Sequence, residues 1–176
     1  MLKTILALVV FTFGIFLTSC DKPKDPMNQI PVPTEVKPVD PQLLNQSQIG
    51  QTVYVPIYSH LPYTGSKKIL PMRAVLSIRN VSEKHSLIVS RIDYYDTNGK
   101  LLKKHIKTPL SLAPLASYDL EIPSLDLSGG TGANFIVRWD STQKMTEPII
   151  EALMYGSAVH QSYSFLSVGK NIKDEE

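Results

Sequence analysis

The chain has 176 residues, one cysteine, one tryptophan and a formal net charge of +2. This length suits one folded domain with additional segments rather than two full domains. With 43% hydrophobic and 19% charged residues, the composition excludes a disordered polyampholyte, a coiled coil and a collagen. A single cysteine excludes an internal disulfide and a zinc site built from thiolates alone. The small net charge gives no electrostatic reason to expect nucleic acid as a partner.

The first 20 residues have the pattern of a bacterial lipoprotein signal peptide. Lys3 precedes an apolar stretch at residues 5–17, which is shorter than the roughly 20 residues that a permanent membrane span requires. A positive start followed by a short apolar run is typical of a secretory signal. The stretch ends in Leu-Thr-Ser-Cys at residues 17–20, which resembles a lipobox. In proteins with this pattern the cysteine receives a diacylglycerol, the chain is cut before it, and the new amine is acylated.

We therefore predict a signal peptide over residues 1–19 and a lipid on Cys20 that attaches the protein to a membrane of the cell envelope. Two or more acyl chains anchor a protein stably, because each buried methylene contributes about 0.8 kcal/mol. The alternative is that Cys20 is removed with an ordinary signal peptide. Asp21 resembles an inner-membrane retention signal of enteric bacteria, but that rule varies among lineages. The choice between inner and outer membrane stays open.

Residues 20–49 form a proline-rich segment after the predicted anchor. Proline fixes φ and lacks the amide donor, so neither a helix nor a central strand is expected in most of this segment. We predict a semi-extended tether, with one short helical turn where Asp40 caps Pro41. A proline-rich ligand for a partner domain is the alternative. The prolines are Pro23, Pro26, Pro31, Pro33, Pro38 and Pro41.

The remainder has the pattern of an all-β domain, which we place at residues 50–169 with a polar tail at 170–176. Alternating, β-branched and aromatic runs predict strands, and Asn98-Gly99 predicts a hairpin. The order of strand end, proline corner and alternating strand at 108–122 resembles a crossing between sheets. Short strands at this spacing favour an immunoglobulin-like, antiparallel, two-sheet β-sandwich of about seven to eight strands. The predicted strands are 52–58, 73–80, 86–96, 101–106, 117–122, 134–140, 149–155 and 161–168.

Several of these segments together resemble one known family. Residues 50–60 (GQTVYVPIYSH), 93–100 (DYYDTNGK), 128–139 (SGGTGANFIVRW) and 148–156 (PIIEALMYG), with LSIRN at 76–80 and LAS at 115–117, look like the family called domain of unknown function 3124. The resemblance covers about residues 49–169 in the same order. It implies a similar secreted or lipid-anchored bacterial protein, and it implies no activity, cofactor or substrate.

A predicted loop at residues 58–68 combines aromatic and basic side chains. Such side chains on a loop carried by a rigid sheet suit a glycan or an anionic polymer, and ordinary loop residues are the alternative. The residues of this candidate binding surface are Tyr58, His60, Tyr63, Lys67 and Lys68.

A second candidate is the glycine-rich segment 128–134, with Gly129, Gly130 and Gly132. It lacks the lysine of a P-loop and precedes a strand rather than a helix. Its backbone amides suit an anion-binding nest, and a tight connection that needs positive φ is the alternative.

No sequence-local catalytic or metal motif accompanies these loops. None of His60, His85, His105 and His160 stands at the spacing of a metal motif, and neither G-x-S-x-G nor a Cys–His pair is present. Glu151 interrupts an apolar run, and an Arg138–Glu151 pair across neighbouring strands is one interpretation of it.

We therefore predict a non-enzymatic, lipid-anchored envelope module without a cofactor. Its partner would be another envelope protein or a cell-wall or glycan component. One alternative is a hydrolase or ligand-processing enzyme assembled in space from Tyr58, His60, Glu151 and Arg138. Another is a periplasmic metal carrier, which requires histidines or methionines to converge.

Overall fold

The structure is a computed structural model that describes residues 36–63, 67–158 and 161–172. The predicted signal peptide, Cys20 and most of the predicted tether lie outside the described residues. Among the residues that are described, no helix has both the length and the apolar character needed to cross a membrane.

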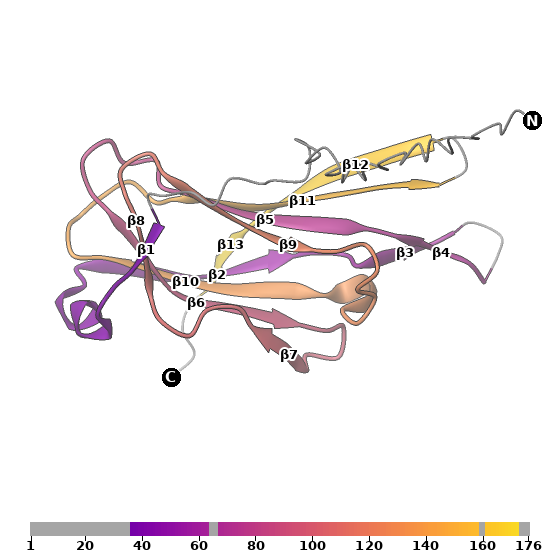
Figure 1. The fold of residues 1–176 in the computed structure, drawn as a ribbon, viewed down its shortest axis with the longest axis horizontal. Coiled ribbons are helices and arrows are strands. Elements are labelled where there is room, and N and C mark those ends of the chain that lie inside the picture. The colour runs from indigo at the N-terminus through magenta and orange to yellow at the C-terminus, as the bar shows by residue number, and fades with distance from the viewer. Residues whose placement is uncertain (1–35, 64–66, 159–160, 173–176) are drawn as a thin grey trace, which may run out of the picture. The chain divides into compact units, whose positions relative to one another are not determined.

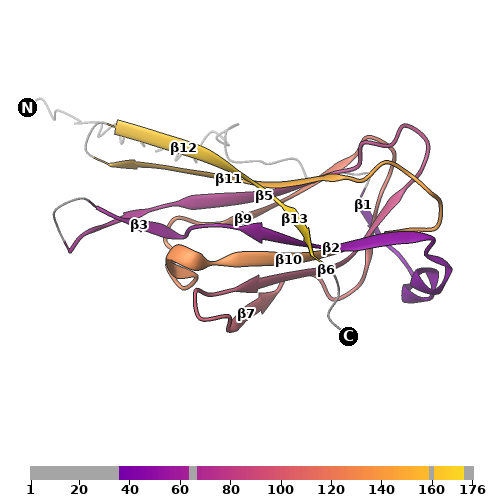
Figure 2. The same ribbon diagram turned by 180° about the vertical axis from the view of Figure 1, so that it is seen from behind.

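The described chain folds into two main antiparallel sheets and a short hairpin (Figures 1 and 2). The large sheet has the order β1 (Val36–Pro38), β8 (Leu110–Leu112), β6 (Leu87–Tyr95), β10 (Asn134–Ser141), β2 (Ile49–Pro56) and β13 (Lys170–Ile172), and β7 (Leu101–Lys104) also pairs with β6. The small sheet has the order β12 (Gln161–Val168), β11 (Ile149–Ala158), β5 (Arg73–Arg79) and β9 (Ser117–Ile122). The hairpin pairs β3 (His60–Pro62) with β4 (Ile69–Pro71) and joins β2 of one sheet to β5 of the other.

The core lies between the two sheets and follows the alternation of the sequence. In β10, Phe135, Val137 and Trp139 are almost fully buried, while Ile136 and Arg138 between them are partly exposed. In β5, Ala74, Leu76 and Ile78 face the same core from the opposite side. Successive strand residues point to opposite faces, so one face of each sheet is apolar and packed. This arrangement confirms the predicted all-β, two-sheet sandwich.

All eight predicted strands are present, with boundaries that differ by a few residues. The sequence did not indicate five further strands, each of three residues: β1, β3, β4, β8 and β13. Of these, β1 lies in the predicted tether and β13 in the predicted polar tail. Both are at or near an edge of the large sheet, where a proline such as Pro38 is tolerated.

Two turns show how local chemistry sets the path of the chain. The predicted helical turn is the 3₁₀ helix η2 (Pro41–Gln46), in which the Asp40 carboxylate accepts a hydrogen bond from the Gln42 amide. The predicted hairpin joins β6 to β7, but only Gly99 has a positive φ, 75°. The Asp96 carboxylate accepts hydrogen bonds from the Asn98 and Lys100 amides. The aspartate therefore supports a turn that needs one left-handed residue and not two.

Two of the crossings between the sheets depend on local backbone geometry. The segment between β8 and β9 carries the chain from the large to the small sheet, as predicted, and Leu115 there has a φ of 59°. The second crossing is Gly169, between β12 and β13. A Cβ on Gly169 would approach the Ile150 carbonyl and a Val53 methyl, each at 2.7 Å. Only glycine lets the chain pass this close to the core at the crossing.

Candidate functional site

The residues predicted to form a binding loop divide into a packed group and an exposed group. Tyr58 is partly buried, and its ring meets that of Phe165 edge-to-face with centroids 5.5 Å apart. His60 is also partly buried, in β3. Tyr63, Lys67 and Lys68 are exposed at the far end of the β3–β4 hairpin. Tyr58 therefore contributes to packing, and the exposed residues of this group are those at the hairpin end.

The two predicted loops meet at one end of the sandwich. Ser59 donates two hydrogen bonds to the Gly130 carbonyl, from its amide at 3.0 Å and from its hydroxyl at 3.1 Å. The Ile57 amide donates to the Ala133 carbonyl at 2.9 Å. The short 3₁₀ helix η3 (Gly130–Gly132) consequently lies beside β3 at the end of the sandwich opposite η2 (Figure 1).

Thr97, in the β6–β7 turn, holds the glycine-rich segment in place. Its hydroxyl donates to the Gly129 carbonyl at 3.0 Å and accepts from the Gly132 amide at 2.9 Å. Its own amide donates to the same Gly129 carbonyl. Gly130 has a φ of 78°, and a side chain there would collide with the Thr97 hydroxyl. Sequence reasoning did not single out Thr97, because nothing in a turn sequence indicates a contact 32 residues away.

The predicted anion nest consists of amides that the protein largely uses itself. The Gly132 amide is bonded to Thr97, and the Gly130 amide donates to the Leu127 carbonyl at 3.3 Å. Gly129 is buried, and a Cβ there would overlap the hydroxyl of Tyr94. Burial, reinforced by the charge of Asp126, raises the pKa of that phenol. The geometry therefore favours a tight structural connection with positive φ at Gly130.

We expect Thr97→Val to lower the free energy of unfolding by about 1 kcal/mol, because two hydrogen bonds of the hydroxyl are lost while the shape is kept. Thr97→Ser retains both bonds and serves as the matched control. Urea denaturation of the three proteins measures the effect. Equal stability of Thr97→Val and the unmodified chain would mean that the Thr97 hydroxyl does not hold the segment.

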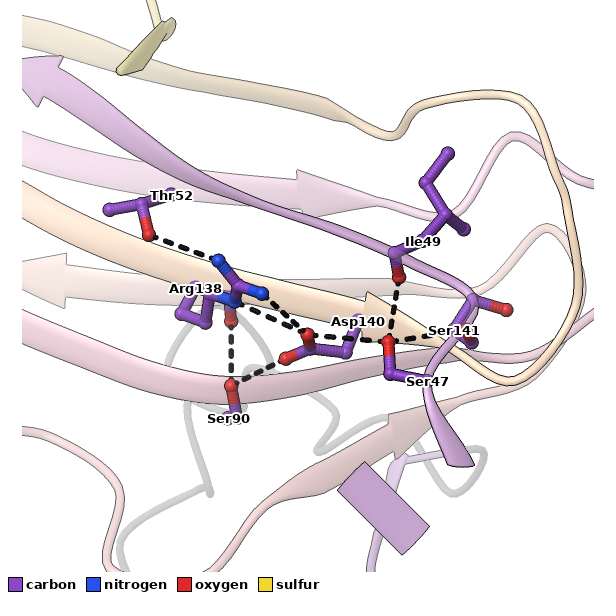
Figure 3. A network of polar contacts seen from close by, with 7 residues as sticks. All are labelled: Ser47, Ile49, Thr52, Ser90, Arg138, Asp140 and Ser141. Atoms are coloured by element: carbon purple, nitrogen blue, oxygen red, sulfur yellow. Dashed lines mark hydrogen bonds and ion pairs between the residues drawn. The ribbon is translucent and has the colours of Figure 1, made fainter. Parts of the chain in front are cut away.

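A network of polar side chains surrounds Asp140 on the outer face of the large sheet (Figure 3). The Asp140 side chain is only 7% exposed. It accepts hydrogen bonds from Arg138 Nη2 at 3.0 Å and from Ser90 Oγ at 2.9 Å, and Arg138 Nη1 reaches Thr52 Oγ1 at 3.4 Å. Ser47, after η2, lies beside the same carboxylate and donates to the Ile49 carbonyl. The network ties the end of η2 to three strands of the sheet.

A second Arg-x-Asp pair lies on the neighbouring strand. Arg91 Nε donates to Asp93 at 2.7 Å, and Arg91 Nη2 donates to the Tyr95 hydroxyl at 2.8 Å. Arg138 is directly opposite Arg91 in the β10–β6 register. Like charges opposite each other destabilise a sheet, so each arginine is compensated by the aspartate two residues along its own strand.

The residues of the alternative enzyme hypothesis lie in different parts of the sandwich. Arg138 points from the outer face of the large sheet, whereas Glu151 points from the outer face of the small sheet and pairs with Arg79 at 3.7 Å. The interpretation of an Arg138–Glu151 pair across neighbouring strands is therefore wrong, because β10 and β11 belong to different sheets. In the part of the chain that the structure describes, no three or more histidine, cysteine, aspartate or glutamate side chains gather as they would around a metal ion.

The outer face of the small sheet carries a group of exposed apolar side chains, which we call the apolar face. Its central row runs Leu166, Leu153, Val75 across β12, β11 and β5 and ends at Glu121 on β9. Leu153 is 42% and Leu166 is 53% exposed. The apolar face consists of the partly buried Val75 and the exposed Ile149, Leu153, Tyr155, Leu166 and Val168.

Two ion pairs lie among and beside the residues of the apolar face, and Glu151 stands between Ile149 and Leu153 on β11. Arg73 pairs with Glu121 at 2.9 Å and also lies over the Tyr155 ring, 5.9 Å from its centroid. Arg79 and Glu151 form the second pair, next to Ile149. Exposed apolar side chains gathered on one sheet face beside charged ones are typical of a protein interaction site. The sequence indicated a strand at 149–155 with an almost continuous apolar run, and the structure exposes one side of that run.

Comparison with known proteins places the chain in a family. The sequence model of the family described as "Protein of unknown function (DUF3124)" matches residues 50–172. No match was found among curated proteins. Among solved structures, the chain is similar to the crystal structure of Thermotoga maritima 1070, with 14% identity, a TM-score of 0.41 and coverage of 68% of this chain and 92% of that chain. Because the family match includes strands from both sheets and more than half of the sequence, the chain belongs to the DUF3124 family.

Proposed function

We propose that this protein is a lipid-anchored module of the bacterial cell envelope that binds another envelope protein without catalysing a reaction. The observation that carries the binding role is the apolar face of the small sheet. The lipobox-like sequence at residues 17–20 supports the anchor, and the proline-rich segment after it supports a tether that separates the sandwich from the membrane.

The chemistry of the apolar face favours a protein as the partner over a glycan. Five of its six side chains are aliphatic and the sixth is Tyr155. The most exposed aliphatic ones include Leu153, Leu166 and Val168, whose side chains offer no hydrogen bond. A polar glycan gains little from such a surface. A protein patch with an apolar centre and charges of both signs at its rim would match the leucines and the Arg73–Glu121 and Arg79–Glu151 pairs.

The anchor is tested by labelling cells with palmitate. We expect label on the unmodified protein and none on Cys20→Ser, because the thiol is the acylated group. The full chain with its signal sequence is used in both cases, and membrane fractionation is followed in parallel. An unlabelled native protein, or equal label in Cys20→Ser, would contradict lipid attachment at this residue.

The binding role is tested by placing a photo-crosslinking amino acid at Leu153 in the full chain in its own cells. The matched control is the same amino acid at Lys104, an exposed position of the large sheet. We expect a covalent product with a second protein from position 153 and not from position 104, and we expect Leu166→Asp to reduce it at least fivefold. Products that are equal at both positions, or that contain lipid or only this chain, would overturn the proposal.

A further inference from the structure

The strand β12 presents a long edge to which no described strand is bonded. It pairs with β11 on one side from Gln161 to Val168, in one continuous register without a bulge. Its other side is the end of the small sheet. Such an edge offers a row of main-chain donors and acceptors to another strand.

The other sheet edges in the described ranges are blocked in ways that proteins commonly use. The opposite edge of the small sheet, β9, carries Asp119 and Glu121. The edges of the large sheet are three or four residues long and contain a proline or lysines, in β1, β7 and β13. In contrast, β12 has eight residues with neither a charge nor a proline.

The register shows which residues of β12 direct their main-chain groups outward. The Gly169 amide donates to the Ile150 carbonyl at 2.9 Å, which makes this a hydrogen-bonded pair. Hydrogen-bonded and non-hydrogen-bonded pairs alternate along an antiparallel ladder. The residues whose N–H and C=O groups point away from β11 are therefore Ser162, Ser164, Leu166 and Val168.

We propose that a second copy of this chain pairs with this edge, β12 against β12 in antiparallel orientation about a two-fold axis. A two-fold interface uses the same patch of both copies, with residue i against residue j and j against i. Like charges near the axis would approach each other, and β12 carries no charge. In the register that we propose, the outward-facing groups pair with Ser164 opposite Leu166 of the second copy and with Ser162 opposite its Val168. The register is thus consistent with the symmetry.

The side chains on the outer face favour the same arrangement. Leu166 and Val168 are 53% and 68% exposed at the open edge, and in the pair the two Leu166 side chains become diagonal neighbours across the axis. The two small sheets become one, and the two apolar faces become continuous. This inference goes beyond the proposed function and does not depend on the lipid anchor.

Sedimentation velocity of the chain from residue 20 onward, with Cys20→Ser, tests the proposal over a range of concentrations. We expect a reversible dimer that Ser164→Pro weakens at least tenfold. Proline at 164 removes only an outward N–H, a position where edge strands tolerate it. The matched control is Asp119→Pro on β9, which removes an outward N–H from the opposite edge and is expected to leave the dimer unchanged. Circular dichroism verifies that each variant folds.

A second variant covers the case in which Ser164→Pro fails to fold. Leu166→Lys changes one exposed side chain and brings two positive charges together across the axis, so we expect it to weaken the dimer at least tenfold as well. A native monomer at all concentrations, or a dimer that Leu166→Lys leaves intact, would overturn the proposal. A monomer with strong protection of the Ser164 and Leu166 amides in hydrogen exchange would mean that another segment of the same chain covers the edge, and would also overturn it. A monomer that still gives the crosslink from Leu153 would refute the pairing and leave the proposed function standing.

Discussion

Asp140→Ala is expected to lower the free energy of unfolding by about 3 kcal/mol, because it removes a nearly buried carboxylate that pairs with Arg138 and is held by a network of hydrogen bonds. The Asp140 side chain is 7% exposed and accepts hydrogen bonds from Arg138 Nε at 3.2 Å and Nη2 at 3.0 Å. Arg138 lies directly opposite Arg91, so Asp140 also offsets the repulsion between the two arginines. Without Asp140, Ser90 Oγ loses its 2.9 Å acceptor and keeps only the Arg138 carbonyl at 3.5 Å.

A double-mutant cycle with Arg138→Ala separates the charge effect from the loss of packing. We expect the double variant to be more stable than the sum of the two single changes predicts, by more than 1 kcal/mol, because the interaction between the two side chains is lost only once. Asp119→Ala, at an exposed position of β9, is the control and should stay within about 0.5 kcal/mol of the unmodified chain. Strictly additive effects in guanidinium denaturation would show that the two side chains do not stabilise each other.

Alternation in the sequence was sufficient to predict the long strands and the fold class, because a sheet with one buried face imposes a period of two. In β10, for example, Phe135, Val137 and Trp139 mark the core side without ambiguity. A strand of three residues such as β1 or β13 is too short to show this period. These strands form where longer strands leave an edge available, which depends on the assembled sheet.

The sequence did not predict which strands lie next to each other in the sheets. Arg138 and Glu151 each stand on the polar side of a strand, so a pair between them was a reasonable interpretation. The order of the sheets instead gives Arg138 an aspartate on its own strand and gives Glu151 the guanidinium of Arg79. The same limit applies to the Thr97 contact with Gly129, which requires the β6–β7 turn and the η3 segment to be at the same end.

The apolar run at 149–155 illustrates a different limit. Ile150, Ala152 and Met154 fill the core, while Leu153 and Tyr155 remain exposed on the other face. Hydrophobicity alone does not distinguish a strand covered on both sides from one whose second side awaits a partner. The sequence did not show that one side of the run is exposed; this follows from the structure, in which β11 is second from the edge of the small sheet and no described strand covers its outer side. The apolar face and the β12 edge are therefore inferences that depend on topology.

The stability of the protein is expected to fall as the pH is lowered from about 6.5 toward 4, because His105 is held neutral in the folded state. Burial, with a contribution from the charge of Lys103, lowers the pKa of His105 from 6.5 to about 4. The ring lies among Tyr94 and Phe135, with centroids 6.4 and 6.0 Å away, and its Nε2 atom is buried without a hydrogen-bond partner among the described residues.

The difference in proton binding between the folded and unfolded chain explains why acid lowers the stability. Between pH 4 and 6.5 the unfolded chain binds a proton at His105 and the folded chain does not, so acid favours unfolding. A group with these two pKa values lowers the free energy of unfolding by about 2 kcal/mol when the pH falls from 7 to 5. Below pH 4 both states are protonated and the contribution no longer changes.

His105→Phe removes the titrating group and keeps an aromatic ring against Phe135. We expect its loss of stability between pH 7 and pH 5, measured by urea denaturation at both values, to be smaller than that of the unmodified chain by about 2 kcal/mol. The comparison isolates His105, because the carboxylates and other histidines titrate in both proteins. The substitution also removes the buried His105 Nε2 atom, which has no hydrogen-bond partner among the described residues. His105→Phe should therefore be at least as stable as the unmodified chain at pH 7. An identical pH dependence of the two proteins, or an NMR titration of the His105 ring near its ordinary pKa, would show that the ring reaches water in the folded protein.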